Sequence, residues 1–135
     1  MLTIDLAPIE VSAIEARDTD LILRLPNQPI HSSTDQGGED KSKSCSCAFI
    51  IKNGQIEVQH CAIPFESVEW ELSYPGGSSS YFLPQGFEAV GPIRLEFYEC
   101  TDAYREKPPF LVLVGKHFAL EVMDAPSPPK GAYSS

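Results

Sequence analysis

The chain has 135 residues and a formal net charge of −9, and its length suits one domain of about 100–150 residues. An acidic surface of this kind repels phosphate backbones and anionic lipid, which excludes specific nucleic-acid binding and leaves DNA at most passing nearby. No apolar run reaches the about 20 residues of a membrane span, and the N-terminus lacks the basic and apolar regions of a signal peptide. We therefore expect a protein made in the cytoplasm, with reduced cysteines and no membrane contact.

Composition predicts the fold class. Twelve prolines and nine glycines favour strands joined by turns over long helices, and 42% hydrophobic residues are enough for a core. We expect a single, mostly β domain over residues 1–124, folded as a sandwich or a partly closed antiparallel barrel with at most one short helix. Residues 125–135 are rich in proline and serine and predict an extended tail.

The first third of the chain begins with an ambiguous segment. Residues 2–16 fit either a strand or a helix, because the spacing of their apolar residues matches both the period of a strand and the period of a helix. We favour the strand. Leu21–Leu25 predicts a strand that stops at Pro26. Residues 31–44 contain no apolar side chain and are longer than a tight hairpin needs, so they predict a mobile loop.

The middle of the chain contains a strong turn signal. Asn53-Gly54 separates the apolar stretch Ala48–Ile51 from the alternating stretch Ile56–Gln59. An Asn-Gly pair between two such stretches is typical of a tight β-hairpin. The sequence therefore predicts that these two strands pair with each other.

Two later segments alternate strictly between apolar and polar residues. Val68–Tyr74 and Ile93–Glu99 each predict a strand with one buried and one solvent-facing side. Phe110–Val114 is apolar throughout, which suits a central strand covered on both faces. The polar segment Thr101–Lys107 has room for one helical turn.

The polar residues of the alternating strands are the main candidates for a functional surface. If the two strands are neighbours, Glu69, Glu71 and Glu96 form one negative sheet face. Solvation of an ordinary outer surface is the alternative interpretation. Tyr98 and Tyr104 fall outside the inward-facing set, and tyrosine is enriched at protein interfaces, so we expect other subunits to cover part of this surface.

Candidate chemistry is limited to the Cys45-Ser46-Cys47 segment. Two thiols on one face of a strand would reach a single zinc ion, but zinc needs two further ligands, from Cys61, Cys100 or a histidine. The alternative is a pair of buried thiols, and this is the interpretation we favour, with no metal ligand assigned. No nucleophile elbow or phosphate-binding loop is present in the sequence. We therefore expect no enzyme activity and no cofactor.

An order of features over Phe49–Asp102 resembles a known family. A strand at Ile56–Cys61 is followed by an acidic strand at Val68–Glu71, the aromatic-Leu-Pro-Gln-Gly-Phe stretch Phe82–Phe87 and the phrase Gly91–Glu99. This order is similar to that of the tube and baseplate-hub proteins of contractile phage tails. The resemblance implies subunits that form hexameric rings, with their inner sheets joined around a negatively charged lumen. Less chain follows the last phrase than in tube proteins. This disfavours the role of major tube protein and is compatible with a minor tail, baseplate, connector or capsid-decorating protein.

The expected function follows from this resemblance and from the acidic strands. We expect a virion structural protein that acts by oligomeric assembly with other copies of itself and with other virion proteins. A small acidic binding or inhibitory protein, such as a phage anti-defence protein that mimics nucleic acid, is the alternative. A thiol or zinc site built on Cys45 and Cys47 is the third hypothesis.

Overall fold

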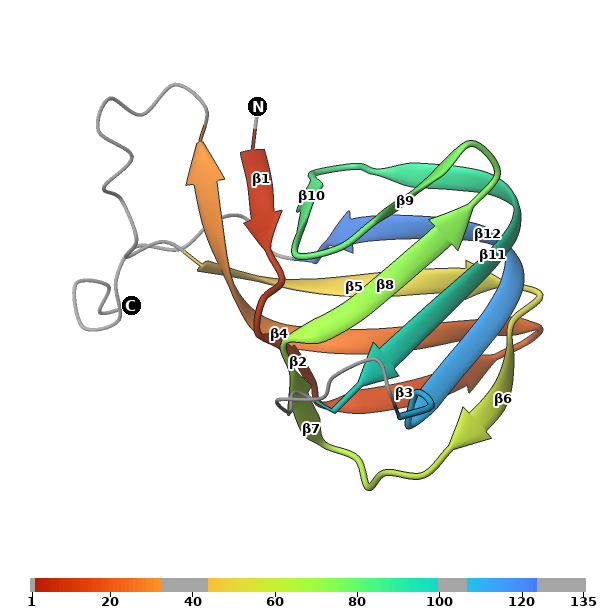
Figure 1. Ribbon diagram of the computed structural model, residues 1–135. Helices are drawn as coiled ribbons and strands as arrows, with labels where there is room; N and C mark the ends of the chain where they lie inside the picture. The colour runs from red at the N-terminus through yellow and green to blue at the C-terminus, as the bar shows by residue number, and fades with distance from the viewer. Residues whose placement is uncertain (1, 33–43, 100–106, 124–135) are drawn as a thin grey trace.

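A computed structural model describes residues 2–32, 44–99 and 107–123, and these form twelve strands and no helix (Figure 1). The strands are β1 (Leu2–Asp5), β2 (Ile9–Val11), β3 (Ala13–Arg17), β4 (Asp20–Ser32), β5 (Ser44–Lys52), β6 (Gln55–Gln59), β7 (Phe65–Ser67), β8 (Glu69–Tyr74), β9 (Gly77–Ser79), β10 (Phe82–Pro84), β11 (Glu88–Tyr98) and β12 (Leu111–Val122). The predicted β class is confirmed. Residues 33–43 of the predicted loop, residues 101–106 of the predicted helical turn and the predicted tail lie outside the described residues.

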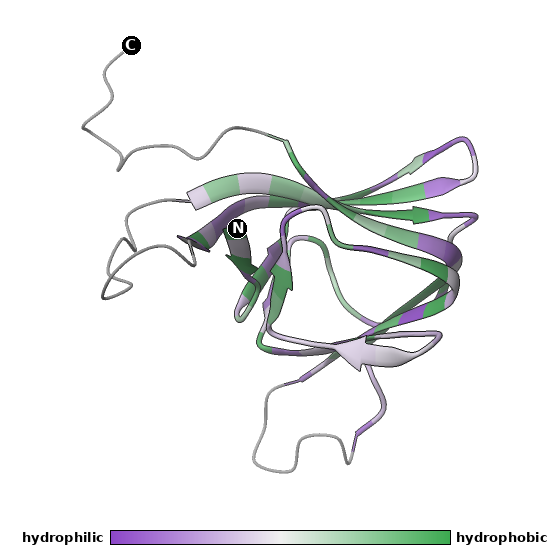
Figure 2. Cartoon of the chain, turned by 90° about the horizontal axis from the view of Figure 1, so that it is seen from above, coloured by the Kyte–Doolittle hydropathy of each residue, from purple (hydrophilic) through white to green (hydrophobic). Residues whose placement is uncertain are grey.

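Ten strands form one antiparallel sheet that curls into a nearly closed barrel. Its order is β10-β1-β4-β5-β12-β11-β8-β9, with β3 added to β4 and β6 added to β12. The two ends of this order are joined by the chain itself, because β9 leads through Ser80 and Tyr81 into β10. A 2.7 Å hydrogen bond from the backbone N–H of Leu6 to the carbonyl of Tyr81 strengthens the junction. Seen from above, the strands surround an interior (Figure 2).

The small second sheet, formed by β2 and β7, packs against the same core. The ring of Phe65 on β7 lies edge-on to Phe97 and Phe110, with ring centroids 5.3 Å apart in both pairs. Trp70 on β8 is fully buried, and its indole N–H donates a 2.6 Å hydrogen bond to the carbonyl of Leu6, which lies between β1 and β2. The core therefore connects the barrel wall to the chain that leads into the small sheet.

The N-terminal segment forms strands, as favoured from the sequence, but the end predicted for the next strand is wrong. Residues 2–16 contribute to β1, β2 and β3, and β4 continues past Pro26 to Ser32. The register of β4 against β5 shifts between Leu25 and Gln28, so Pro26 lies in a bulge, where its missing N–H leaves no gap in the ladder. The hydroxyl of Ser46 donates to the carbonyl of Pro26 at 2.8 Å.

Gln28 holds the bend between β1 and β2. It is buried, and its side-chain amide donates to the carbonyls of Asp5 at 2.8 Å and Pro8 at 3.1 Å. Its side-chain oxygen accepts a 2.9 Å hydrogen bond from the backbone N–H of Glu10. These three bonds satisfy a buried polar side chain, which would otherwise destabilise the fold.

The structure contradicts the predicted hairpin at Asn53-Gly54. β5 and β6 do not pair with each other; both pair with β12. The register is kept from Lys52 opposite His117 to Gln55 opposite Val114, and it shifts only farther along β6, where Ile56 lies opposite Leu113 and Val58 opposite Val112. β6 therefore continues the line of β5 instead of reversing it. Asn53 has a φ of 53°, so the Asn-Gly pair did indicate a left-handed residue. That conformation produces a kink here and not a reversal.

Gly115 allows β12 to lie close to β5 at this kink. Leu113 and Phe118 of β12 both belong to the buried core, so the inward-facing alternation shifts by one residue between them. A Cβ atom at Gly115 would collide with the side chain of Ile51 and lie 2.8 Å from the carbonyl oxygen of Lys52. It would also lie 3.5 Å from the Cα of Gly54. Close contact between the strands thus requires glycine at position 115.

Candidate interaction face

The two strands that carry the predicted acidic residues are neighbours. In the antiparallel register of β8 and β11, Glu71 lies opposite Glu96 and Glu69 lies opposite Tyr98. The alternate residues of the same strands are buried, so these four side chains face outward. We call the surface formed by Glu57, Glu69, Glu71, Arg94, Glu96 and Tyr98 the acidic face.

Arg94 is the cation at the centre of the acidic face. Its Nε donates to Glu96 at 2.8 Å and its Nη1 donates to Glu57 at 2.9 Å. These hydrogen bonds raise the pKa of Arg94 above its ordinary value, and the bond that Arg94 donates to Glu96 has the larger effect. β12 pairs with β11 on one side and with β6 on the other, so the bond to Glu57 bridges β12 and ties its two neighbours together.

Sequence reasoning missed the role of Glu57 and Arg94. The outward direction of Arg94 follows from the alternation, and a contact with Glu96 two residues later on the same face could have been inferred. Glu57 is 37 residues away in sequence. Its proximity depends on β6 lying beside β12, which the predicted hairpin did not imply.

The tyrosines of this region hold the carboxylates in place. The Tyr98 hydroxyl donates to Glu96 Oε1 at 3.0 Å, and the Tyr81 hydroxyl donates to Glu69 Oε1 at 3.3 Å. Tyr81 is 38% exposed. Tyr104, the remaining predicted surface tyrosine, lies outside the described residues.

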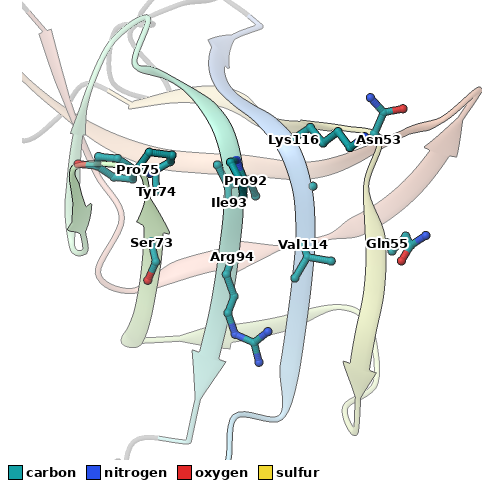
Figure 3. Close-up of a pocket in the computed structure, with 11 residues that line it drawn as sticks. Asn53, Gln55, Ser73, Tyr74, Pro75, Pro92, Ile93, Arg94, Val114 and Lys116 are labelled. Carbon is teal, nitrogen blue, oxygen red and sulfur yellow. The ribbon is translucent and has the colours of Figure 1, made fainter.

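A shallow groove of about 670 Å³ lies at the upper end of the acidic face. Ser73, Arg94, Val114 and Gln55 follow one another across β8, β11, β12 and β6 and form one row in register. Figure 3 shows this row below a second group of lining residues. That group includes Tyr74, Pro75, Pro92, Lys116 and Asn53.

One wall of the groove depends on a bulge in β11. The register of β11 against β12 shifts between Val90 and Ile93, and Gly91, with a φ of 109°, lies inside the shift. A Cβ atom at Gly91 would lie 2.8 Å from Cγ of Pro75. Glycine therefore permits both the bulge and the close approach of Pro75 at the groove wall.

Cys45 and Cys47 are buried thiols. Both belong to the core and are 3% and 1% exposed. A hydrogen bond with Cys45, together with burial, raises the pKa of the Cys47 thiol. Among the described residues no group of three or more His, Cys, Asp or Glu side chains is placed to hold a metal ion. Cys100, which the zinc hypothesis invoked, lies outside them.

The burial of these thiols predicts selective labelling. At pH 8, N-ethylmaleimide should modify half-buried Cys61 in the native protein and leave Cys45 and Cys47 unmodified, because a buried neutral thiol is a poor nucleophile. All three should react in denaturant. Mass spectrometry of peptides from labelled samples measures this, and rapid native labelling of Cys47 would contradict the buried position.

Comparison with family models, with curated proteins and with solved structures gave no match. In the described part of the chain, no helix is long and apolar enough to cross a membrane. The functional interpretation therefore rests on the residues of the acidic face and its surroundings.

Proposed function

We propose that the protein is a structural subunit that acts by packing against neighbouring subunits, within a phage tail, baseplate or connector. The observation that supports this most is the acidic face, where carboxylates and tyrosines are held in register on a barrel wall. Like charges directly opposite each other, such as those of Glu71 and Glu96, disfavour a sheet, and Arg94 and Tyr98 offset only part of this effect at Glu96. Hydrogen-bond donors from a neighbouring subunit would offset this repulsion, and tyrosine is enriched where proteins meet.

The virion assignment rests on the resemblance over residues 49–102. The two strands and the phrase Gly91–Glu99 of that resemblance overlap β6, β8 and β11, and these strands carry the acidic face. The proposed partners are further copies of the chain and other virion proteins. DNA passes nearby at most, because the acidic face carries four carboxylates and only one guanidinium group, and this combination repels the phosphate groups of DNA.

Charge reversal at Glu71 tests this proposal. Glu71→Lys should create an attractive pair with Glu96 across the strands, so the melting temperature should stay equal or rise. Sedimentation velocity over a concentration series should nevertheless show loss of the oligomers that the wild type forms.

Glu66→Lys is the matched control. Glu66 lies opposite Glu10 in the small sheet, so this variant makes the same chemical change away from the acidic face and should assemble as the wild type does. If Glu71→Lys and the wild type sediment identically at every concentration, the acidic face is not an assembly surface.

The same face also favours the second candidate, a small acidic binding or inhibitory protein. Binding of this kind should weaken steeply as salt rises, because it depends on exposed charges. Titration of a labelled lysine- and arginine-rich peptide against the wild type and Glu71→Lys, at low and high salt, measures it. Equal affinity of the two proteins, or no dependence on salt, would reject this candidate.

A further inference from the structure

The groove at the upper end of the acidic face has a rigid apolar wall. Its apolar lining is formed by Tyr74, Pro75, Pro92, Ile93 and Val114 (Figure 3). The hydroxyl group of Tyr74 shares a 2.8 Å hydrogen bond with that of Ser79, and its ring lies edge-on to Phe87, with ring centroids 5.6 Å apart. The aromatic wall is therefore held in place before any ligand binds, which lowers the entropy lost on binding.

The sequence after Met123, outside the described residues, contains a segment that suits such a groove. Residues 126–130, which we call the proline-rich segment, read Pro-Ser-Pro-Pro-Lys, a composition that favours the extended polyproline II helix. This helix has three residues per turn, so Pro126 and Pro129 project from the same side of it. Segments with this Pro-x-x-Pro spacing bind in grooves lined by aromatic side chains, because they lose little entropy on binding.

We propose that the proline-rich segment of one copy binds in the groove of a second copy. Pro126 and Pro129 pack on the apolar wall, and Lys130 points toward the acidic face. Pro75 directly follows β8 and lies four residues beyond Glu71, a span of about 13 Å in extended chain. Pro126 and Lys130 are also four residues apart, about 12 Å in a polyproline II helix. The segment therefore has the length needed to reach from the groove wall to the carboxylates.

The charges of the two surfaces are complementary. Lys130 is the cation of the proline-rich segment, and the acidic face beside the groove is net negative. Its guanidinium group belongs to Arg94, which already donates hydrogen bonds to Glu96 at 2.8 Å and to Glu57 at 2.9 Å. Lys116, a second cation that lines the groove, lies above Arg94 (Figure 3). This arrangement orients the segment with Lys130 toward the carboxylates and away from Lys116.

The proline-rich segment cannot reach the groove of its own copy. The backbone N–H of Met123 donates a 2.8 Å hydrogen bond to the carbonyl of Ser46, which fixes the point where the tail begins. Lys116, on the same strand as Val114, lies seven residues before Met123, a distance of roughly 20 Å along a bent strand. Three residues lead from Met123 to Pro126 and span at most about 10 Å. The segment in the groove must therefore come from another copy.

Exchange of tails between copies gives a head-to-tail contact. The groove and the tail are different surfaces, and each copy offers one of each, so the contact can propagate into a closed ring or an open filament. Such a short segment buries far less than the roughly 1,200 Å² of a stable specific interface, so a single contact should be weak and should strengthen where several act together. This inference rests on the proposed assembly function and specifies one of its contacts.

Peptide binding tests the groove. A synthetic peptide of residues 124–135 is passed over the protein immobilised at low density, and surface plasmon resonance measures its affinity. The peptide should bind the wild type saturably and bind Pro92→Arg roughly tenfold more weakly, because a long cationic side chain would cover the apolar wall and repel Lys130. Pro108→Arg is the matched control: Pro108 is also exposed and does not line the groove. This variant should bind as the wild type does, and melting temperatures confirm that both variants are folded.

Changes in the peptide test the two parts of the proline-rich segment separately. Replacement of Pro126 and Pro129 by alanine should weaken binding roughly tenfold, because both the packing and the preformed helix are lost. Lys130→Ala should weaken binding roughly threefold at low salt and have no effect at high salt, because its contact depends on exposed charges. A peptide that binds equally well after both changes would contradict the assigned contacts.

Three results would overturn the proposal. The first is a peptide that shows no saturable binding, and the second is equal binding by the wild type and Pro92→Arg. The third is a gain in peptide affinity when Pro126 and Pro129 of the immobilised protein are replaced by alanine, since that gain would show that the tail fills its own groove. If the peptide does not bind while Glu71→Lys still loses assembly, the tail contact is rejected and the proposed function stands.

Discussion

Truncation of Trp70 to alanine should lower the free energy of unfolding by about 3–5 kcal/mol, the usual loss for a large buried aromatic side chain. Trp70 is 0% exposed, and its ring centroid lies 5.9 Å from that of Phe49. The substitution also leaves the buried carbonyl of Leu6 without its 2.6 Å hydrogen bond. The link between β8 and the connection from β1 to β2 would therefore be lost together with the packing.

Equilibrium unfolding in urea measures this change. Trp70→Phe is the matched variant, because it keeps a six-membered aromatic ring in the core while it removes the N–H donor together with the rest of the five-membered ring. It should lose about 1–3 kcal/mol, the cost of an unsatisfied buried group. If Trp70→Ala were as stable as Trp70→Phe, packing of the Trp70 ring would not contribute to the stability of the core.

Gly115→Ala should lower the free energy of unfolding by about 1–3 kcal/mol, as other forced overpacking does. The added methyl group would collide with Ile51 and lie 2.8 Å from the carbonyl oxygen of Lys52. A change of rotamer at Ile51 relieves the first contact but not the second, so the backbone of β5 or β12 would have to move.

Gly77→Ala provides the control for backbone effects of glycine replacement. A Cβ atom at Gly77 would meet only Tyr74, at 3.7 Å or more, which is ordinary van der Waals contact. This variant should stay within about 0.5 kcal/mol of the wild type, as exposed substitutions usually do. If Gly115→Ala were equally stable in thermal and urea unfolding, the close approach at the kink would be contradicted.

The parts of the fold that could be predicted are those set by a residue's immediate neighbours. Leu95 and Phe97 are buried in β11 as the alternation predicts, because burial on one face requires that period. Val68, predicted to be a core residue, is 37% exposed. It lies between β7 and β8, outside either strand, where the alternation no longer decides which way a side chain points.

The parts that could not be predicted depend on which strands become neighbours. Asn53-Gly54 reports a local backbone conformation, and only the position of β12 determines that the chain continues past it. The bulge that carries β4 beyond Pro26 likewise depends on β5 lying alongside. The ion pair between Glu57 and Arg94 needs all three strands in place.

The candidate face could be predicted in part for the same reason. The outward direction of Glu71 and Glu96 follows from the two-residue period of a strand. The two side chains were expected to share one face if their strands were neighbours. Whether the strands were adjacent was left open, and the register of β8 and β11 decides it. The groove residues Gln55 and Lys116 come from strands that no sequence pattern connected.

Electron microscopy of the purified protein, over a range of concentrations, tests whether the acidic face is an assembly surface. The wild type should form rings, tubes or other repeating assemblies at high concentration, and these should be lost in Glu71→Lys but not in Glu66→Lys. Single particles of one-subunit size at every concentration would contradict the proposed function for contacts between copies of the chain. The same particles for all three proteins after mixing with the candidate virion components would contradict the assembly function as a whole.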